Sequence, residues 1–198
     1  MKKIIYTCIS SVLLALTLTG CSGLSSVPEE STDAAVDSDY IAVGSRLTVH
    51  NTDDRLTLRD NMDALSADGL YYASWTAGSA EPYENADGDT IDLYDAQLYL
   101  LLGEYKNAES AEGCMADWLA AGHSNYNVTA EETVTCNGQT YTLLTYRFIN
   151  EENPYAKGVS AFGVCGNCAV CIELTCQEEY PEDLHEMLTV FLNGCSYQ

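Results

Sequence analysis

The sequence predicts one α+β domain, a mainly antiparallel twisted sheet with two main helices packed on it. Three observations lead to this fold class. Apolar and polar residues alternate in several short runs, which is typical of half-buried strands. Two segments, near 108–121 and 181–194, instead place apolar residues at helical spacing. One Asn-Gly pair and one Gly-Asn pair each separate two strand-like runs and favour tight antiparallel turns.

The first half of the domain is expected to consist of strands. Alternation predicts short strands at 47–49 and 56–58, and an aromatic strand over 70–76. Residues 91–93 lead into the run 96–102, which is apolar at consecutive positions. A strand of this kind is covered on both faces, so we expect it at the centre of the sheet.

The second half is expected to alternate between helices and hairpins. A helix over 108–121 should stop at Gly122. Two hairpins follow, one with its turn at Asn137 and one within 159–176. Pro181 then opens the last helix. The apolar stripe of this helix consists of Leu184, Met187, Leu188, Phe191, Leu192 and Cys195.

The first residues predict an export signal. Two lysines precede an apolar segment, 4–18, that is too short for a permanent membrane span. The segment runs into the motif Leu-Thr-Gly-Cys at 18–21, which resembles the bacterial lipobox. That resemblance implies cleavage after residue 20 and a diacylglycerol thioether on Cys21. We therefore expect a lipoprotein anchored on the extracytoplasmic face of a bacterial membrane, at the cell surface or on the periplasmic side.

Residues 21–44 are expected to form a disordered acidic tether, followed by the folded domain at 45–198. The tether is rich in Ser, Asp and Glu and has almost no large apolar side chains, so it cannot bury enough surface to offset its ordering entropy. The whole chain has a net charge of −22, and removal of residues 1–20 makes it more negative. Such a charge excludes nucleic acid as a partner, because phosphate binding needs clustered cations.

The order of the expected elements resembles the PsbP-like α/β fold found in many small bacterial lipoproteins. This resemblance rests on the central strand, the helix with Trp118-Leu119, the Asn137-Gly138 hairpin, the second hairpin and the closing helix that ends at Cys195. It covers roughly residues 95–198. Members of this fold mostly act as accessory or binding modules, so the resemblance implies such a role and transfers no catalytic residue.

Cys165, Cys168, Cys171 and Cys176 form a dense cysteine cluster. Four residues rather than three precede the last cysteine, and no proline follows it, which argues against an iron–sulfur loop. On a strand, Cys168 and Cys171 would point to opposite faces, and Cys176 would lie about 26 Å from Cys168. One zinc ion cannot be coordinated by thiols this far apart, so we expect neither a metal site nor a cofactor.

The same cluster leaves a second functional class open. Cys165 and Cys168 could serve an envelope thiol–disulfide oxidoreductase or another thiol-dependent enzyme. A reactive thiol usually needs a helix N-terminus or a nearby cation, and the sequence offers neither at this turn. Nine cysteines instead favour an oxidising compartment and structural disulfides, with at least one thiol left over in the mature domain.

One disulfide, Cys168–Cys195, is predicted from lengths. The strand 168–176 spans about 26 Å and a helix over 181–194 rises about 21 Å, so the helix should run back along most of the strand. Its apolar stripe is expected to cover the strand face that carries Cys168 and not Cys171. The bond would close a loop of about 27 residues and contribute about 3 kcal/mol to stability.

Two further patterns have ordinary explanations. Residues 85–92 resemble part of a calcium loop, but no register supplies both the required glycine and the terminal glutamate, so an acidic turn is expected. His50, His123 and His185 belong to no recognisable nucleophile or metal motif. We therefore name no catalytic residue.

The predicted function is that of a non-enzymatic binding or accessory module. Its anchor is the lipid on Cys21, and its partner is an unidentified protein, peptide or glycan. Tyr71, Tyr72 and Trp75 leave two interpretations open. They would form either a stacking platform for sugars or peptides, or part of the interface between sheet and helices.

Overall fold

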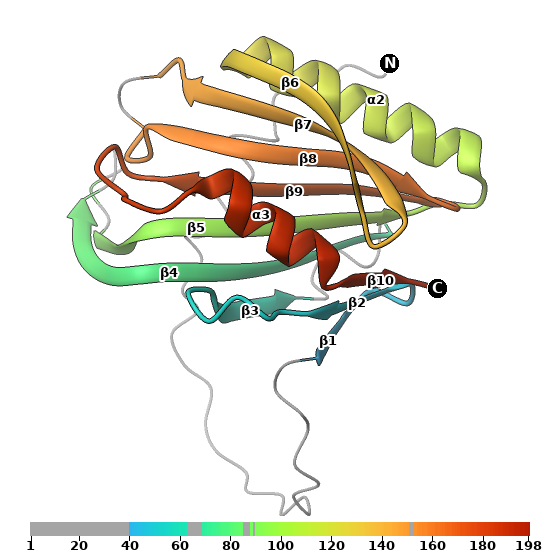
Figure 1. The fold of residues 1–198 in the computed structure, drawn as a ribbon, viewed down its shortest axis with the longest axis horizontal. Helices are drawn as coiled ribbons and strands as arrows, with labels where there is room; N and C mark the ends of the chain where they lie inside the picture. Colours follow the sequence, from blue (N-terminus) through green and yellow to red (C-terminus); the bar gives the residue numbers. More distant parts are fainter. Residues whose placement is uncertain (1–39, 63–68, 85–87, 89, 151–152) are drawn as a thin grey trace, which may run out of the picture.

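Figure 1 shows the computed structural model, which describes residues 40–62, 69–84, 88, 90–150 and 153–198. The strands are β1 (Tyr40–Val43), β2 (Leu47–His50), β3 (Thr57–Met62), β4 (Leu70–Glu84), β5 (Thr90–Glu104), β6 (Tyr126–Cys136), β7 (Gln139–Phe148), β8 (Lys157–Cys165), β9 (Cys168–Cys176) and β10 (Cys195–Tyr197). The helices are α2 (Ala108–Asn125) and α3 (Leu184–Asn193).

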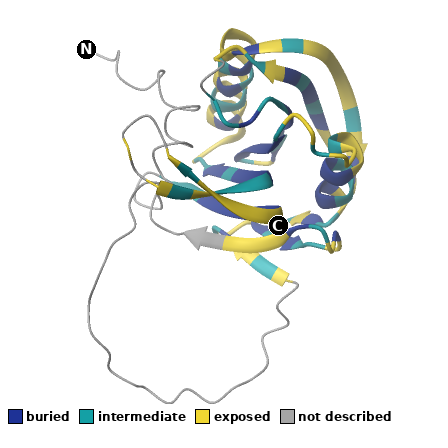
Figure 2. Ribbon diagram, turned by 90° about the vertical axis from the view of Figure 1, so that its left-hand side faces the viewer, coloured by how far each residue is buried: buried dark blue, intermediate teal, exposed yellow. Residues whose placement is uncertain are grey.

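The strands pair in two antiparallel sheets. The larger sheet has the order β3-β4-β5-β9-β8-β7-β6, and the smaller one has the order β1-β2-β10. Helix α3 lies across one face of the larger sheet, and α2 packs against the other face over β8 and β9 (Figures 1 and 2). The predicted α+β class, with a mainly antiparallel sheet and two main helices, is confirmed.

Strand β9 shows how the sheet separates two cores. All nine of its residues are buried, and its side chains alternate between the face under α3 and the face under α2. Cys168, Val170 and Ile172 pack in the core on the α3 face, whereas Cys171 packs in the core on the α2 face. The predicted placement of the last helix on the Cys168 face is therefore confirmed. Its Phe191 ring meets Trp75 edge-on at 4.7 Å.

The tight turns follow their expected chemistry. Asn137 and Gly138, between β6 and β7, both have positive φ, at 46° and 78°. This combination defines the type I′ turn that the Asn-Gly pair predicted. Gly166, between β8 and β9, also has a positive φ of 61°. Both predicted hairpins are therefore present.

Strands β4 and β5 are longer than the sequence predicted. Each has fifteen residues, and they form one continuous hairpin that merges the segments expected at 91–93 and 96–102. The register shifts between Ala77 and Ala80, where Gly78 has a φ of 79°. Of the predicted acidic turn at 85–92, residues 85–87 and 89 lie outside the described residues.

Helix α2 does not stop at Gly122, so that prediction is wrong. The helix continues to Asn125, and Gly122 is buried against the sheet. A Cβ at this position would lie 3.1 Å from Leu144 Cδ1. Gly122 therefore lets the helix pack closely on the side chains of Leu144 and Phe162, which is a packing role that local helix rules do not distinguish from a stop.

Two boundaries also differ from prediction. Strand β1 begins at Tyr40 and Val43 is 1% exposed, so ordered structure begins before residue 45, inside the segment expected as tether. Helix α3 begins after Asp183, whose side chain caps it, rather than at Pro181. Cys195 lies beyond this helix in β10 and pairs with Val49 of β2. Strand β1 pairs with the adjacent β2, whereas β10 depends on a partner distant in sequence, which alternation alone does not reveal. None of the described helices is long and apolar enough to cross a membrane.

Candidate functional site

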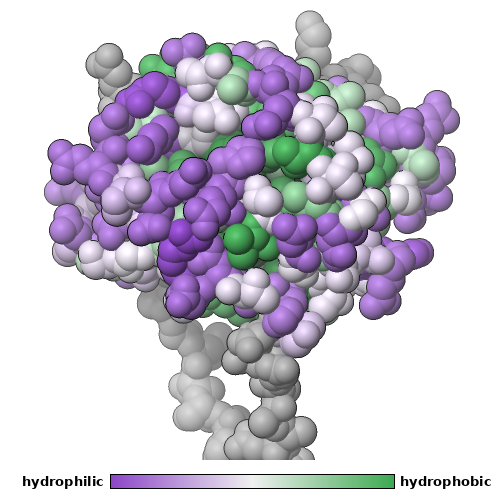
Figure 3. Space-filling model, in the orientation of Figure 1, coloured by the Kyte–Doolittle hydropathy of each residue, from purple (hydrophilic) through white to green (hydrophobic). Residues whose placement is uncertain are grey.

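A groove of about 490 Å³ lies beside the loop that joins β9 to α3. Three segments distant in sequence form its walls: the β2–β3 connection, the β4–β5 hairpin and the loop itself. We call it the acidic groove. The residues that define its character are Arg55, Gly78, Asp95, Glu179, Tyr180 and Glu182. In Figure 3, hydrophilic residues cover much of the face on which α3 lies, with smaller hydrophobic areas between them.

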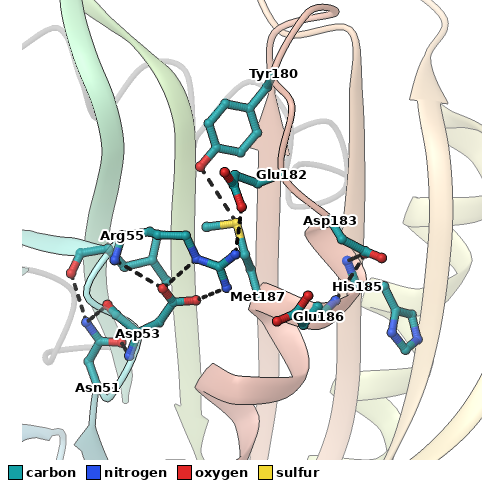
Figure 4. A network of polar contacts seen from close by, with 10 residues as sticks. Asn51, Asp53, Arg55, Tyr180, Glu182, Asp183, His185, Glu186 and Met187 are labelled. Atoms are coloured by element: carbon teal, nitrogen blue, oxygen red, sulfur yellow. Dashed lines mark hydrogen bonds and ion pairs between the residues drawn. The ribbon is translucent and has the colours of Figure 1, made fainter.

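Arg55 closes one wall of the acidic groove by joining two carboxylates. Its Nη2 lies 2.7 Å from Asp53 Oδ2, and its Nη1 lies 2.9 Å from Glu182 Oε2 (Figure 4). Hydrogen bonds from Arg55 hold the pKa of buried Asp53 below its ordinary value, although burial opposes them. This network links the β2–β3 connection to the start of α3, where Asp183 accepts bonds from the backbone N–H groups of His185 and Glu186.

Asp95 reaches the acidic groove because the β4 bulge gives it room. A Cβ on Gly78 would lie 2.0 Å from Asp95 Oδ2, so only glycine fits there with the side chain in this place. The same oxygen accepts a hydrogen bond from the backbone N–H of Ser79 at 3.1 Å. The backbone oxygen of Asp95 accepts from the N–H of Gln177, which joins the bulge to the β9–α3 loop.

The charges of the acidic groove favour a cationic ligand. Asp95, Glu179 and Glu182 supply three carboxylates, and Arg55 supplies one guanidinium. That guanidinium already serves two carboxylates, Asp53 and Glu182, so it offers little attraction to an anion. In a chain of net charge −22, the surrounding field has the same sign. The charges of this site therefore favour an ammonium or guanidinium group over an anion.

Glu173 is a second notable group, and no sequence motif singles it out. It lies on the α2 face of β9 and is 5% exposed. Its Oε1 accepts hydrogen bonds from the hydroxyls of Tyr126, at 2.7 Å, and of Tyr146. Burial raises the pKa of Glu173, and hydrogen bonds from these tyrosines and from Ser160 oppose that rise. A glutamate inside a mostly apolar central strand was the sequence signal that could have revealed it.

Tyr126 and Tyr146 enclose this carboxyl group. Their rings stack at 3.9 Å, and Phe148 meets both rings edge-on. A cavity of about 10 Å³, lined in part by Gly122, Ser160 and Glu173, lies beneath the end of α2. That volume accommodates at most one water molecule. The Glu173 cluster is therefore a buried titratable site rather than a substrate pocket.

The seven described cysteines are all thiols in this structure, including Cys168 and Cys195. The predicted Cys168–Cys195 disulfide therefore stays a prediction, although both residues belong to the core on the α3 face. Among the described residues, no group of three or more His, Cys, Asp or Glu side chains could hold a metal ion. Cys21, the predicted lipid-anchor residue, lies outside the described residues.

The environment of Cys165 differs from that of a catalytic thiol. Burial raises its pKa to about 12, the neighbouring Cys168 adds to the rise, and only a hydrogen bond from Tyr197 opposes it. The pKa of Cys168 is also raised by burial. Nucleophilic thiols need the opposite shift, because the thiolate is the reactive form. The oxidoreductase alternative stays a prediction, and burial places the pKa shifts of both thiols in the direction opposite to that of an activated thiol.

The remaining candidates have structural partners. Trp75 packs against Phe191, and Tyr71 contacts the same core, so these residues belong to the interface of sheet and helix rather than to an exposed stacking platform. Tyr72 is buried and tilts against Tyr99 on the other face. The histidines are surface groups: His185 contacts Glu132, His123 contacts Glu131 and His50 stacks on Tyr40.

No family model matches the sequence, and no curated protein is significantly similar to it. The structure is similar to the solution structure of cyanobacterial PsbP (CyanoP) from Synechocystis sp. PCC 6803. That likeness has a TM-score of 0.39 and 12% sequence identity, and covers 73% of this chain and 93% of the other. The α+β class follows from the sheets and helices themselves, and at this TM-score the likeness carries no conclusion about function.

Proposed function

We propose that this protein is a membrane-anchored extracytoplasmic lipoprotein that acts as a non-enzymatic binding or accessory module. Its acidic groove receives a lysine or arginine side chain of a protein or peptide partner. The observation that carries this proposal is a groove of about 490 Å³ with two carboxylates, those of Asp95 and Glu179, beside a guanidinium that is already paired with Asp53 and Glu182. Its size suits an extended side chain and part of the adjoining backbone.

Long-range electrostatics support the same partner class. A strongly negative chain attracts cationic partners and accelerates their association at low ionic strength. The predicted tether would hold the domain away from the membrane, so that the groove could meet a partner in the surrounding envelope. PsbP-like proteins, which the sequence resembles, mostly act as accessory or binding modules.

Charge removal in the acidic groove should weaken binding of a cationic peptide. We expect the double variant Asp95→Asn/Glu179→Gln, in detergent-solubilised full-length protein, to bind hexalysine roughly 2- to 30-fold more weakly than wild type, since each exposed ion pair contributes about 0.2–1 kcal/mol. Asparagine keeps the acceptor that the Ser79 N–H uses. Isothermal titration calorimetry at low salt measures the effect.

The matched control removes the same charge elsewhere. Glu109 and Glu112 are exposed on α2, so Glu109→Gln/Glu112→Gln should leave hexalysine affinity close to that of wild type. An equal loss in both double variants would show that net charge alone attracts the peptide, and would overturn the groove as a specific site.

The anchor is tested separately. In the variant Cys21→Ser, the thioether with diacylglycerol cannot form, so we expect no incorporation of labelled palmitate. The protein should leave the membrane fraction or remain as an unprocessed precursor with residues 1–20 attached. Palmitate labelling in the host cell, followed by fractionation, measures both outcomes. Lipid labelling equal to that of wild type would refute the lipoprotein assignment.

A further inference from the structure

Four cysteine residues lie close to one end of the larger sheet. Strand β6 ends at one cysteine, β8 ends at a second, and β9 begins with a third, while β10 contributes a fourth from the smaller sheet. All four are buried or nearly so. They are Cys136, Cys165, Cys168 and Cys195.

Among these four, Cys165 and Cys168 have a special relation. They flank the two-residue turn between β8 and β9 and are direct partners in the antiparallel register. Directly opposite residues in such a pair have Cα atoms about 4.5–5.5 Å apart. A disulfide requires a Cα separation of about 4.4–6.8 Å. Their side chains leave the same face of the sheet, because partners in register always do.

The other two cysteines are less well placed. Cys136 lies on β6, and β7 separates that strand from β8. Two strand spacings amount to about 9.6 Å, which exceeds the limit for a disulfide. The thiol of Cys195 points back to helix α3, where its Sγ lies 3.6 Å from the backbone oxygen of Phe191. Cys195 also lies near Cys136 and Cys165, but among these four cysteines only Cys165 and Cys168 are direct partners in strand register.

We propose that Cys165 and Cys168 form a disulfide that closes the β8–β9 turn in the exported protein. The two thiols exchange with the disulfide of an extracytoplasmic dithiol oxidase. They give up two electrons and two protons, the oxidase disulfide is reduced to two thiols, and one new sulfur–sulfur bond joins the strands. Because Cys168 has one sulfur, this bond excludes the Cys168–Cys195 pairing predicted from the sequence.

The timing of oxidation follows from burial. In the folded protein Cys165 is 9% exposed and Cys168 is 2% exposed. Burial also raises the pKa of both thiols, so little thiolate is present at neutral pH to attack an oxidant. The disulfide therefore forms before the hairpin is covered by α3 and β10. Oxidised glutathione supplied during refolding should produce it, and the same reagent added to folded, reduced protein should do so far more slowly.

Peptide mapping of the full-length lipoprotein, purified from the envelope with free thiols alkylated, tests the proposal. No lysine or arginine follows Lys157, so the digest uses a glutamate-specific protease. Cleavage at glutamates yields a 153–173 peptide with three cysteines and a separate 187–198 peptide with Cys195. We expect the first peptide to carry one alkyl group, on Cys171. Its mass should be about 2 Da lower than that of the same singly alkylated peptide with Cys165 and Cys168 as free thiols, because the disulfide lacks two hydrogen atoms.

Variants make the outcome decisive. Cys165→Ser and Cys168→Ser should each abolish the internal bond, whereas Cys171→Ser should retain it. Three alkylated thiols in the 153–173 peptide of wild type would overturn the proposal. A covalent link between that peptide and 187–198 would also overturn it, and loss of the link in Cys168→Ser but not in Cys165→Ser would identify the Cys168–Cys195 pairing. Because both results that would overturn the proposal come from wild-type protein, a variant that folds poorly affects neither of them.

Discussion

Replacing Phe191 with alanine is expected to lower the free energy of unfolding by about 3–5 kcal/mol. Phe191 is fully buried in α3, and its ring meets the Trp75 ring edge-on at 4.7 Å with an interplanar angle of 77°. Alanine would remove the transfer free energy of the ring and leave a cavity between helix and sheet. It would also remove the aromatic contact, which contributes beyond the buried area. Helix α3 would then be held mainly by its leucines and Met187.

Urea denaturation at equilibrium, followed by tryptophan fluorescence and circular dichroism, measures the change. The control is Leu58→Ala, because Leu58 is a large apolar residue that is 39% exposed. Its truncation should cost less than about 1.5 kcal/mol. Similar losses in the two variants would mean that Phe191 is not part of a closely packed core, which would contradict the position of α3.

Replacing Glu173 with glutamine is expected to change how stability depends on pH. Burial raises the pKa of Glu173 above the ordinary 4.5, so the carboxyl group favours its protonated form in the folded protein. Its contribution to stability is fully present below pH 4.5 and is lost as the pH rises through the folded-state pKa. Above pH 4.5 the unfolded chain ionises first, and wild type loses up to about 1.4 kcal/mol for each pH unit.

Glutamine cannot ionise, yet its side-chain oxygen can still accept the hydroxyls of Tyr126 and Tyr146. The stability of Glu173→Gln relative to wild type should therefore increase as the pH rises above 4.5, and level off beyond the folded-state pKa. Urea denaturation of both proteins from pH 4 to pH 8 measures this difference. A difference that stays constant over the range would show that burial does not perturb the carboxyl group.

The matched control is Glu178→Gln, which removes a carboxylate whose pKa is lowered in the folded protein, whereas that of Glu173 is raised. Glu178 is exposed and pairs with Arg147, which lowers its pKa. Its contribution is present above pH 4.5 and lost as the pH falls through the folded-state pKa. Its removal should therefore make the variant less stable than wild type at neutral pH, and this difference should disappear in acid. The two glutamates should give pH trends of opposite sign.

The acidic groove and the Glu173 cluster were not predictable from local patterns. The groove combines Arg55, Asp95 and Glu182, which are separated by long stretches of chain and meet only after β5 and β9 pair. Glu173 was visible as a glutamate within a buried strand, but its tyrosine partners come from β6 and β7. Periodicity indicates which face of a strand or helix a residue occupies. It gives no information about which side chains from other elements contact that residue.

The sequence by itself determined most of the elements and which face each of their residues occupies. The 2.0-residue period of β9, the 3.6-residue period of α3 and the Asn137-Gly138 turn depend on neighbours within a few residues, so composition and spacing were sufficient. Tertiary structure alone decided the role of Gly122, the length of the β4–β5 hairpin and the pairing of β1 and β10 with β2. The packing of Gly122 and the pairing of β10 with β2 depend on segments distant in the chain, whereas β1–β2 and β4–β5 are local hairpins whose extent depends on the sheet and core around them. The segment that packs against Gly122 decides that this glycine lies within the helix and does not end it. In the same way, pairing with β2 decides that Cys195–Tyr197 form a strand.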